Sequence, residues 1–378
     1  MLSGELEPGG IVIDNGSAMI RAGFSGKTSP YAVFPSIVCR DDSRNNRMYV
    51  GDDAVLRRDF LSLKSPIQQG VVQSWDEIQE IWSHIFDHVL YVNPQEYPIL
   101  LTESPMNPKA NREKMIEIMF ETYSVPAMYA AIPAVLALLA SGRITGVVLD
   151  SGRDVSHVVP IYEGYAVPRA LEQIGVAGQH VTEYIIKLIH DSGYDYTSTA
   201  KRDVVREIKE KLAYVPLDFD AEMKKINSTV VGGKSFKLPD GRVLSIDDQR
   251  LLVRSPELLF NPSMASPEVP STTRAVGVHE AIHNAITKVG VDTRSACYSN
   301  IVLSGGSTCF PGMQPRLVKE MTALAPASAK VEVEAPPARE YTAWLGGSIL
   351  SALQIPTGWI YMEEYEDSGH SIIHRKCI

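Results

Sequence analysis

Two stretches of the sequence place an aspartate at the end of an apolar run and directly before a turn. The first reads IVIDNGS and the second GVVLDSGRD, with the carboxylates at Asp14 and Asp150. The residues after each aspartate are small or polar, namely Asn15, Gly16 and Ser17 in the first stretch and Ser151, Gly152, Arg153 and Asp154 in the second. Turns with exposed N–H groups bind anions, and two carboxylates can hold the waters of a hydrated Mg²⁺ that bridges phosphates. The alternative for each stretch alone is an ordinary hairpin, because Asn-Gly between apolar residues is a common hairpin turn.

A third turn strengthens the phosphate interpretation. Residues 301–308 read IVLSGGST, and Gly305 and Gly306 would let a backbone approach a flat or charged ligand closely. The two aspartates lie 150 − 14 = 136 residues apart in similar surroundings, which suggests a duplicated lobe. With all three turns in place, a phosphate clamp is favoured over an isolated hairpin.

The composition limits the class of protein. The chain has 378 residues, enough for two lobes with separate cores, and its formal charge of −9 argues against direct nucleic-acid binding. No apolar stretch reaches the length of a membrane span, and we expect no membrane association. The four cysteines form no CxxC pair and predict reduced thiols in the cytoplasm or nucleus.

Helices and strands alternate, which predicts an α/β fold. Ser74 and Glu77 suggest a capping box for a helix through about Tyr91. Further helices are expected at 109–123, 133–141, 179–191, 199–213, 278–289, 312–324 and 343–354, and strands at 98–101, 146–149, 155–161 and 300–303. Two segments, RDDSRNNR at 40–47 and 261–274, are expected to be long or polar exposed loops.

The chain resembles the actin family along nearly its whole length. The blocks that carry the resemblance are DNGS at 14–17, AVFPSIV at 32–38, YVGD at 49–52, NPKANREKM at 107–115, IMFET at 118–122, VPIYEGYA at 159–166, IKEKL at 208–212, LPDG at 238–241, VLSGGST at 302–308, GGSIL at 346–350 and HRKC at 374–377. The resemblance implies a two-lobed ATPase fold with four subdomains, shared with sugar kinases and heat-shock ATPase chaperones. The first lobe would comprise 1–140 and 342–378 with an outer piece near 36–65, and the second 141–341 with an outer piece near 177–272.

The resemblance also implies roles for particular residues around ATP or ADP and Mg²⁺. Asp14 and Asp150 would hold the metal through waters, and His157 would be the catalytic candidate. The remaining nucleotide-binding candidates are Asn15, Gly16, Ser17, Arg21, Ser151, Gly152, Arg153, Asp154, Lys209, Glu210, Gly305, Gly306, Ser307 and Phe310. Without the resemblance, Lys209 and Glu210 are typical of a solvated helix face and His157 of a histidine on a strand.

Several positions depart from the family pattern. Pro133 stands where relatives have a glutamine that orients the attacking water, and proline offers no side-chain donor or acceptor. Arg153 and Asp154 replace an acidic residue and a glycine, Glu340 replaces a lysine beside the adenine, and Gln69 replaces a histidine. We therefore expect ATP binding with weak or absent ATPase activity.

The expected assembly surfaces have changed as well. The loop at 40–47 is short and charged, the loop at 261–274 is polar, and the N-terminus carries only Glu5 and Glu7 where actins gather acidic residues. An apolar groove for partner proteins is retained, at Leu139, Ile144, Leu350, Leu353 and Ile355.

Three functions remain open. The first is a nucleotide-stabilised subunit of a larger assembly of actin-like subunits or actin-binding proteins, located in the cytoplasm and cytoskeleton or, within a complex, in the nucleus or axoneme. The second is a divergent polymerising actin with filament-coupled ATPase, and the third is a small-molecule kinase of the same superfamily. Pro133 and the two altered loops favour the first over the second.

Overall fold

The structure, a computed structural model, describes residues 9–43, 46–191, 199–228, 234–237, 243–246, 248–265, 276–353 and 358–377. The chain forms two compact units. Unit 1 comprises residues 1–144, 161–166 and 336–378, and unit 2 comprises residues 145–160 and 167–335. This two-lobed α/β organisation agrees with the fold class that the sequence predicts.

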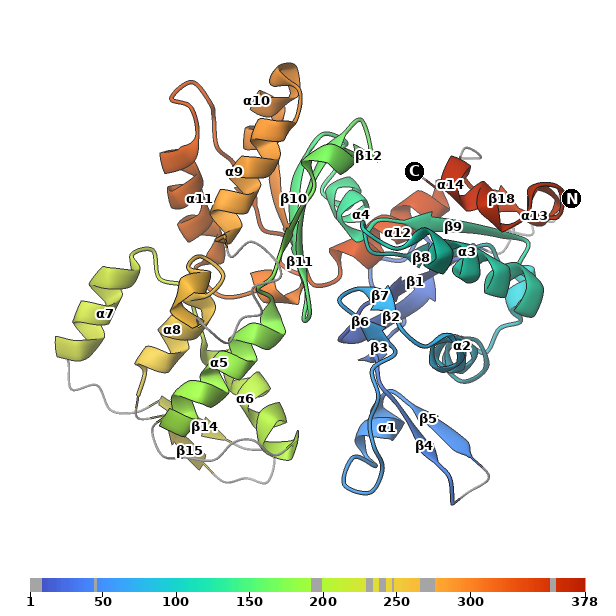
Figure 1. Ribbon diagram of the computed structural model, residues 1–378, viewed down its shortest axis with the longest axis horizontal. Helices are drawn as coiled ribbons and strands as arrows, with labels where there is room; N and C mark the ends of the chain where they lie inside the picture. The colour runs from blue at the N-terminus through green and yellow to red at the C-terminus, as the bar shows by residue number, and fades with distance from the viewer. Residues whose placement is uncertain are drawn as a thin grey trace, which may run out of the picture. The chain divides into compact units, whose positions relative to one another are not determined.

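A six-stranded sheet forms the centre of unit 1 (Figure 1). Its strands, in spatial order, are β18 (Ile360–Tyr361), β9 (Ala127–Ala131), β8 (Ile99–Thr102), β1 (Ile11–Asn15), β2 (Met19–Phe24) and β3 (Ala32–Pro35). Strand β1 pairs antiparallel with β2 and parallel with β8. The first acidic stretch is therefore a hairpin, but its strands end at Asn15 and resume at Met19, so the turn is longer than the two-residue Asn-Gly type.

The second sheet has a similar topology. Its strands, in spatial order, are β12 (Tyr165–Ala166), β11 (Ser156–Tyr162), β10 (Gly146–Ser151), β16 (Ile301–Ser304) and β17 (Val333–Glu334), and β13 (Glu172–Ile174) also pairs with β11. Strand β10 neighbours the next strand of the chain, β11, and pairs parallel with β16. Strand β1 likewise lies between its hairpin partner β2 and the parallel strand β8, so the duplication suggested by the two aspartates appears in the strand pairing.

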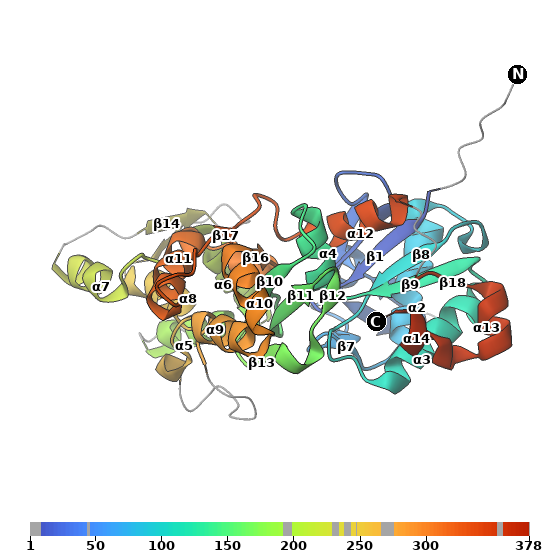
Figure 2. The same cartoon turned by 90° about the horizontal axis from the view of Figure 1, so that it is seen from above.

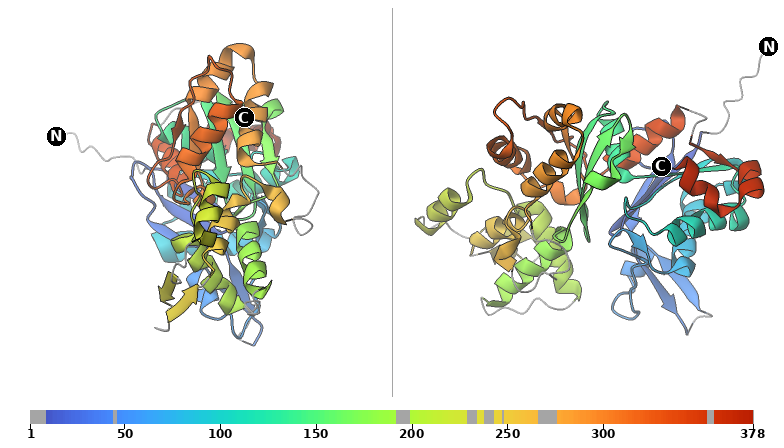
Figure 3. Two further views of the ribbon diagram at one scale, coloured as in Figure 1. Left: turned by 90° about the vertical axis from the view of Figure 1, so that its left-hand side faces the viewer. Right: turned by 45° about the horizontal axis from the view of Figure 1, so that its top comes forward.

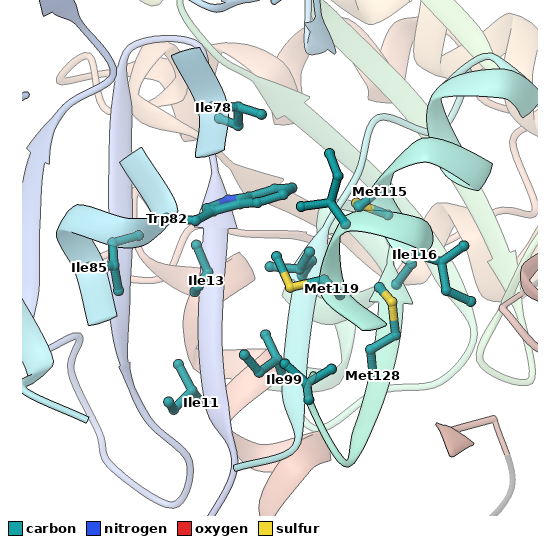
Figure 4. Close-up of a cluster of buried hydrophobic side chains, with 14 of the residues drawn as sticks. Ile11, Ile13, Ile78, Trp82, Ile85, Ile99, Met115, Ile116, Met119 and Met128 are labelled. Atoms are coloured by element: carbon teal, nitrogen blue, oxygen red, sulfur yellow. The ribbon is translucent and has the colours of Figure 1, made fainter. Parts of the chain in front are cut away.

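Helices and sheet enclose the main core of unit 1. Side chains from β1, β8, α2 (Trp75–His84), α3 (Lys109–Glu117) and the π-helix η3 (Ile118–Thr122) fill one apolar space (Figure 4). Trp82 and Ile13 are completely buried there. Apolar residues at helical spacing on α2 therefore face the core, as expected.

The start of α2 differs from the predicted capping box. Ser74 occupies the N-cap position, but its side chain makes no capping hydrogen bond. Glu77 instead forms an ion pair with Lys64 at 3.1 Å. The capping-box prediction was wrong because the glutamate has a lysine partner.

Two of the predicted helices change their winding before they end. The α-helix α2 stops at His84 and continues as the π-helix η1 (Ile85–Leu90), and α3 continues as η3. Tyr91 closes the first of these with a left-handed backbone at φ 54°. The predicted ranges 74–91 and 109–123 thus cover continuous helical segments of two kinds.

A second pair of helices covers β1. Helix α4 (Pro133–Ala140) begins at Pro133, which suits the first helical turn. Helix α12 (Thr342–Ala352) lies along β1 (Figure 2) and packs against α4. A Cβ on Gly346 would come within 1.9 Å of the Leu136 carbonyl oxygen, so this close approach requires glycine.

Helices of unit 2 surround a core of their own. The predicted helices appear as α5 (Gly178–Asp191), α6 (Thr199–Leu212), α9 (Val278–Lys288) and α11 (Met313–Leu324). Three more were not predicted, namely α7 (Phe219–Ser228), α8 (Arg250–Glu257) and α10 (Val291–Ser299). A buried, bidentate ion pair joins Arg316 on α11 to Glu257 on α8, with both N–O distances at 2.9 Å.

Small clusters of buried side chains lie in the segments predicted as outer pieces. Cys39, Tyr49 and Ala54 form one in unit 1, and a second in unit 2 includes Ile185 and Leu252. The remaining short elements are α1 (Asp52–Val55), β6 (Ile67–Gln68), β7 (Val71–Val72), β14 (Lys234–Lys237), β15 (Val243–Ile246), α13 (Met362–Ser368) and α14 (Ile373–Lys376). The division of each lobe into two subdomains stays a prediction.

The segment 40–47, predicted as a short, charged and exposed loop, lies at the end of a β-hairpin. Strands β4 (Val38–Asp41) and β5 (Arg47–Val50) form a hairpin, with Asp41 opposite Arg47. The hairpin projects from the rest of unit 1 (Figures 1 and 3). Pairing of the backbone extends into the charged segment because side chains on an exposed hairpin need no buried face. Arg44 lies outside the described residues.

In the segment predicted as a polar loop at 261–274, the structure describes residues 261–265, and part of these is less exposed than predicted. Residues Pro262–Ala265 form a short 3₁₀ helix, η5, in which Pro262 and Ala265 are buried. Met264 packs against the core of unit 2. The remaining residues, 266–274, lie outside the described residues, as do Glu5 and Glu7. No helix within the described ranges is long and apolar enough to cross a membrane.

Candidate nucleotide-binding site

The first acidic turn fixes its carboxylate at both oxygens. Asp14 lies near the end of β1 and is buried. Thr102 Oγ1 donates a hydrogen bond to Asp14 Oδ1 at 2.8 Å, and Arg21 Nη1 contacts Oδ2 at 2.9 Å. A carboxylate accepts up to about four hydrogen bonds, so Asp14 keeps acceptor capacity for a water.

Arg21 has one donor with no partner within the described part of the chain. Its Nε is buried without a hydrogen bond, although Nη1 contacts Asp14. The guanidinium carbon lies 5.6 Å from the centre of the Tyr341 ring, which restrains the group from one side. A buried N–H of a charged group normally has an acceptor, and an anionic oxygen would satisfy it.

The other residues of this turn hold its shape. A Cβ on Gly16 would come within 2.5 Å of the Met19 carbonyl oxygen, so the turn requires glycine there. Ser17 Oγ accepts a hydrogen bond from Gly70 N at 3.2 Å. Asn15 Oδ1 accepts from Trp82 Nε1 at 3.1 Å, which ties the predicted binding residue to the core.

The second acidic turn, in unit 2, repeats the arrangement of the first. Asp150 lies near the end of β10, and Ser304 Oγ donates to its Oδ1 at 3.0 Å. Ser304 is the last residue of β16, the parallel neighbour of β10, just as Thr102 is the last residue of β8. In each unit, therefore, a hydroxyl from the neighbouring parallel strand orients the carboxylate.

Backbone contacts close the turn that follows Asp150. Gly152 N donates to Val155 O at 3.0 Å, and Gly152 O accepts from Gly178 N at 3.0 Å and from Ser307 Oγ at 2.7 Å. The turn is thereby joined both to the start of α5 and to the third glycine turn. The connection to the third glycine turn is made by Ser307, one of the residues that the sequence predicts as nucleotide-binding candidates.

Side chains of the same turn have different surroundings. Ser151 is fully buried and its hydroxyl is 2.7 Å from that of Ser156, which points to a structural part for this side chain. Arg153 Nε lies 3.4 Å from Asp154 Oδ1, and the arginine side chain is partly exposed. The cation that replaces the family's acidic residue thus lies beside the new aspartate.

The third turn is built around two glycines with different constraints. Gly305 has φ +84°, and a Cβ there would lie 2.4 Å from Ser151 O and 2.9 Å from Asp150 Oδ1. A Cβ on Gly306 would meet no heavy atom of the described residues within 4 Å. Gly305 therefore packs against the second acidic turn, whereas a side chain at Gly306 would enter open space. Phe310, four residues further on, is buried in the core of unit 2.

Lys209 and Glu210 of α6 differ in exposure. Lys209 is buried and its Nζ donates to Gly178 O at 3.1 Å, whereas Glu210 is exposed. Burial lowers the pKa of Lys209 to about 8, Arg206 and Arg153 lower it further, and Glu210 opposes them. For Lys209 the alternative of a solvated helix face is wrong, while Glu210 fits it.

The catalytic candidate His157 and the positions that depart from the family pattern differ in their surroundings. His157 is buried on β11, and burial lowers its pKa to about 4, so the ring is neutral near pH 7. Pro133 is the first residue of α4. Gln69 is exposed in a left-handed conformation with φ 50°, and Glu340 is half-buried.

Thr102, Ser304 and Gly178 were missed by sequence reasoning. A signal existed for the first two, because each follows an apolar run that reads as a buried strand. The carboxyl ends of parallel neighbours meet at one edge of a sheet. Gly178 carries no signal of this kind, since its contact with Gly152 depends on where α5 begins.

Each acidic turn, taken by itself, has groups that could contact an anion or a hydrated cation. In unit 1 the unpartnered Nε of Arg21 suits an anionic oxygen. In unit 2 the open side of Gly306 leaves room for a flat or charged group. Carboxylates such as Asp14 and Asp150 are the hard oxygen ligands that Mg²⁺ accepts directly or through water. No group of three or more His, Cys, Asp or Glu side chains arranged for a metal occurs among the described residues, and water-mediated binding by two carboxylates does not require one.

Comparison with protein families identifies the chain's class. Residues 6–378 match the family described as Actin. The chain belongs to the actin family, whose members generally bind a nucleotide with a divalent cation.

Proposed function

We propose that the protein binds ATP or ADP with Mg²⁺ and acts as a nucleotide-stabilised, actin-like subunit of a larger cytoskeletal assembly. The observation that carries the proposal is the repeated acidic turn. In both units an aspartate, Asp14 or Asp150, accepts a hydrogen bond from the last residue of a parallel neighbouring strand. Such repetition is expected when two related halves serve one ligand.

Specific residues would hold the nucleotide. Asp14 and Asp150 would bind the hydrated cation, which when bound neutralises charge on the phosphates. Arg21 would contact a phosphate through its free Nε. The other proposed contacts are the phosphate turns at 15–17 and 151–155 and Ser307, with Lys209, Glu210, Gly305, Gly306 and Phe310 around the nucleoside.

In this proposal the protein hydrolyses ATP weakly or not at all. Pro133 has no side-chain polar atom with which to orient a water. His157, with a pKa of about 4, is a poor general base near pH 7 because efficient proton transfer needs a pKa near the working pH. Removal of a water-orienting group costs about a hundredfold or more in rate.

The surfaces of unit 1 support a subunit role. The β4–β5 hairpin carries Arg40, Asp41 and Arg47 near its tip, and burying such charges without partners costs free energy. In the predicted partner groove, Ile144 and Leu353 are 58% and 57% exposed, while Leu139 and Leu350 are half-buried. Ile355 lies outside the described residues. The exposed apolar side chains of the groove suit a partner protein. The charged hairpin, in contrast, is poorly suited to insertion into a neighbouring copy of the chain.

Two assays on the purified chain in Mg-ATP and salt test the proposal. We expect it to stay in the supernatant on sedimentation, to show no filaments by electron microscopy, and to release phosphate far more slowly than a polymerising actin. The Pro133→Gln variant should release phosphate faster than the parent chain. Abundant filaments with rapid phosphate release would favour the alternative function, a divergent polymerising actin, and would overturn the subunit role.

A further inference from the structure

Two pairs of histidines in unit 1 have the spacing i, i+4. His84 ends α2 and His88 lies one turn later in η1, whereas His370 and His374 lie near the C-terminus. Residues four apart lie on one face of a helix, so the rings of each pair are neighbours. The two pairs differ in what their ring nitrogens contact.

In the C-terminal pair both imidazole rings contact one carboxylate. His374 Nε2 lies 2.9 Å from Glu113 Oε1, and His370 Nε2 lies 3.6 Å from Glu113 Oε2. Both histidines therefore direct the same nitrogen to one acidic side chain. A metal ion would have to displace these contacts.

For the pair at the end of α2, the side-chain contacts found among the described residues are with other rings. The centres of the His84 and His88 rings are 5.7 Å apart, and His84 packs edge-on against Phe34 at 5.5 Å. Within the described ranges, neither imidazole makes a hydrogen bond or an ion pair. His84 is half-buried and positioned by Phe34, while His88 is exposed and can rotate.

The separation of the two rings suits a shared ion. Imidazole nitrogens bind Zn²⁺ at about 2.0–2.1 Å, which places two ring centres on one tetrahedral ion roughly 5 Å apart. The observed 5.7 Å between the two ring centres is close to this value. The junction of α2 with a π-helix is also a kind of irregularity that often occurs at functional sites.

We propose that His84 and His88 together bind one divalent transition-metal ion, such as Ni²⁺, Zn²⁺ or Cu²⁺, with water completing its coordination. Imidazole is a preferred ligand of these ions and not of Mg²⁺. The site is therefore separate in its chemistry from the proposed nucleotide site. It does not depend on nucleotide binding.

The surroundings of His84 favour the binding of a metal ion. Burial lowers the pKa of His84, His88 lowers it further and Asp53 opposes them, so the neutral ring that metals require is available near pH 7. Asp53 is exposed, and its Oδ1 lies 3.6 Å from Arg57 Nη1. A bound ion would join the α-helical and π-helical parts of this segment and stabilise the folded chain.

Titration of Ni²⁺ into the metal-stripped full chain, in buffer that contains Mg²⁺ and no nucleotide, tests the proposal by calorimetry. We expect about one Ni²⁺ per chain and at least tenfold weaker binding in His88→Gln, because one of two protein ligands is lost. His370→Gln is the matched control, since it removes an exposed histidine of the other pair, and its affinity should stay within about twofold of the parent.

A second measurement separates metal loss from misfolding. Circular dichroism should show His88→Gln folded like the parent, since the ring is exposed, and His88→Cys should restore Zn²⁺ binding because thiolate is also a zinc ligand. Absence of Ni²⁺ binding at millimolar concentration, or equal affinity in the parent and His88→Gln, would overturn the proposal. Loss of binding in His370→Gln with His88→Gln unaffected would also overturn it.

Discussion

Lys209 makes the proposed nucleotide affinity dependent on pH. Burial lowers its pKa from the ordinary 10.5 to about 8, while its Nζ donates to Gly178 O. In the proposed complex Lys209 lies beside the nucleoside, and the negative charge of the phosphates on the same nucleotide favours the charged ammonium and raises this pKa again. Nucleotide binding above pH 8 should therefore be accompanied by uptake of a proton.

The magnitude follows from the lowered pKa. At pH 9 only about one-tenth of Lys209 is protonated in the free protein, so the affinity for ATP should fall about tenfold between pH 7 and pH 9. The same shift bears on stability. Between about pH 8 and 10.5 the folded chain holds fewer protons than the unfolded chain, so the free energy of unfolding should rise with pH, by up to about 3 kcal/mol from this residue.

Equilibrium binding of a fluorescent ATP analogue at the two pH values measures the effect, and Lys209→Met is the control. The variant should bind with nearly the same affinity at both values, because the titrating group is gone. Proton uptake can be checked by calorimetry in two buffers of different ionisation enthalpy. An affinity that does not change in the parent chain, or a tenfold fall that persists in Lys209→Met, would refute the reasoning.

Three further variants test the packing of the site and of its support. Gly346→Ala should lower the free energy of unfolding by about 2 kcal/mol or more in urea denaturation, because its Cβ would clash with Leu136 O. Gly306→Ala should leave the unfolding midpoint nearly unchanged, since the added methyl enters open space, but should weaken ATP binding; unchanged affinity would argue against a ligand there. Thr102→Val should cost about 1–3 kcal/mol of stability, because it removes a hydrogen bond to the buried carboxylate of Asp14, and a stability equal to that of the parent would contradict that contact.

The sequence predicted the acidic turns well because their pattern is local. An apolar run, an aspartate and a glycine are adjacent residues, and the strands β1 and β10 that carry them are buried as the apolar runs suggest. Helices such as α2 were predictable for the same reason, since the spacing of Ile78, Ile81 and Trp82 marks one buried face.

Contacts between distant residues were not predictable from local pattern. Thr102 meets Asp14 only because β8 pairs parallel with β1, and Ser304 meets Asp150 through β16. The capping-box prediction at Ser74 was wrong for a related reason. Glu77 forms an ion pair with Lys64, which lies 77 − 64 = 13 residues earlier in the chain. The hairpin at 40–47 was missed because its charged side chains show no alternation of apolar and polar residues.

Direct measurement of Mg-ATP binding is the sharpest test of the central claim that the two acidic turns serve one nucleotide. Equilibrium dialysis should find one ATP per chain, with affinity that falls when the Mg²⁺ is chelated. Asp150→Asn should abolish most of this Mg²⁺ dependence and Asp14→Asn should do the same, with both variants folded by circular dichroism. Absence of ATP binding in the parent chain, or Mg²⁺-dependent binding unchanged in both folded variants, would contradict the account.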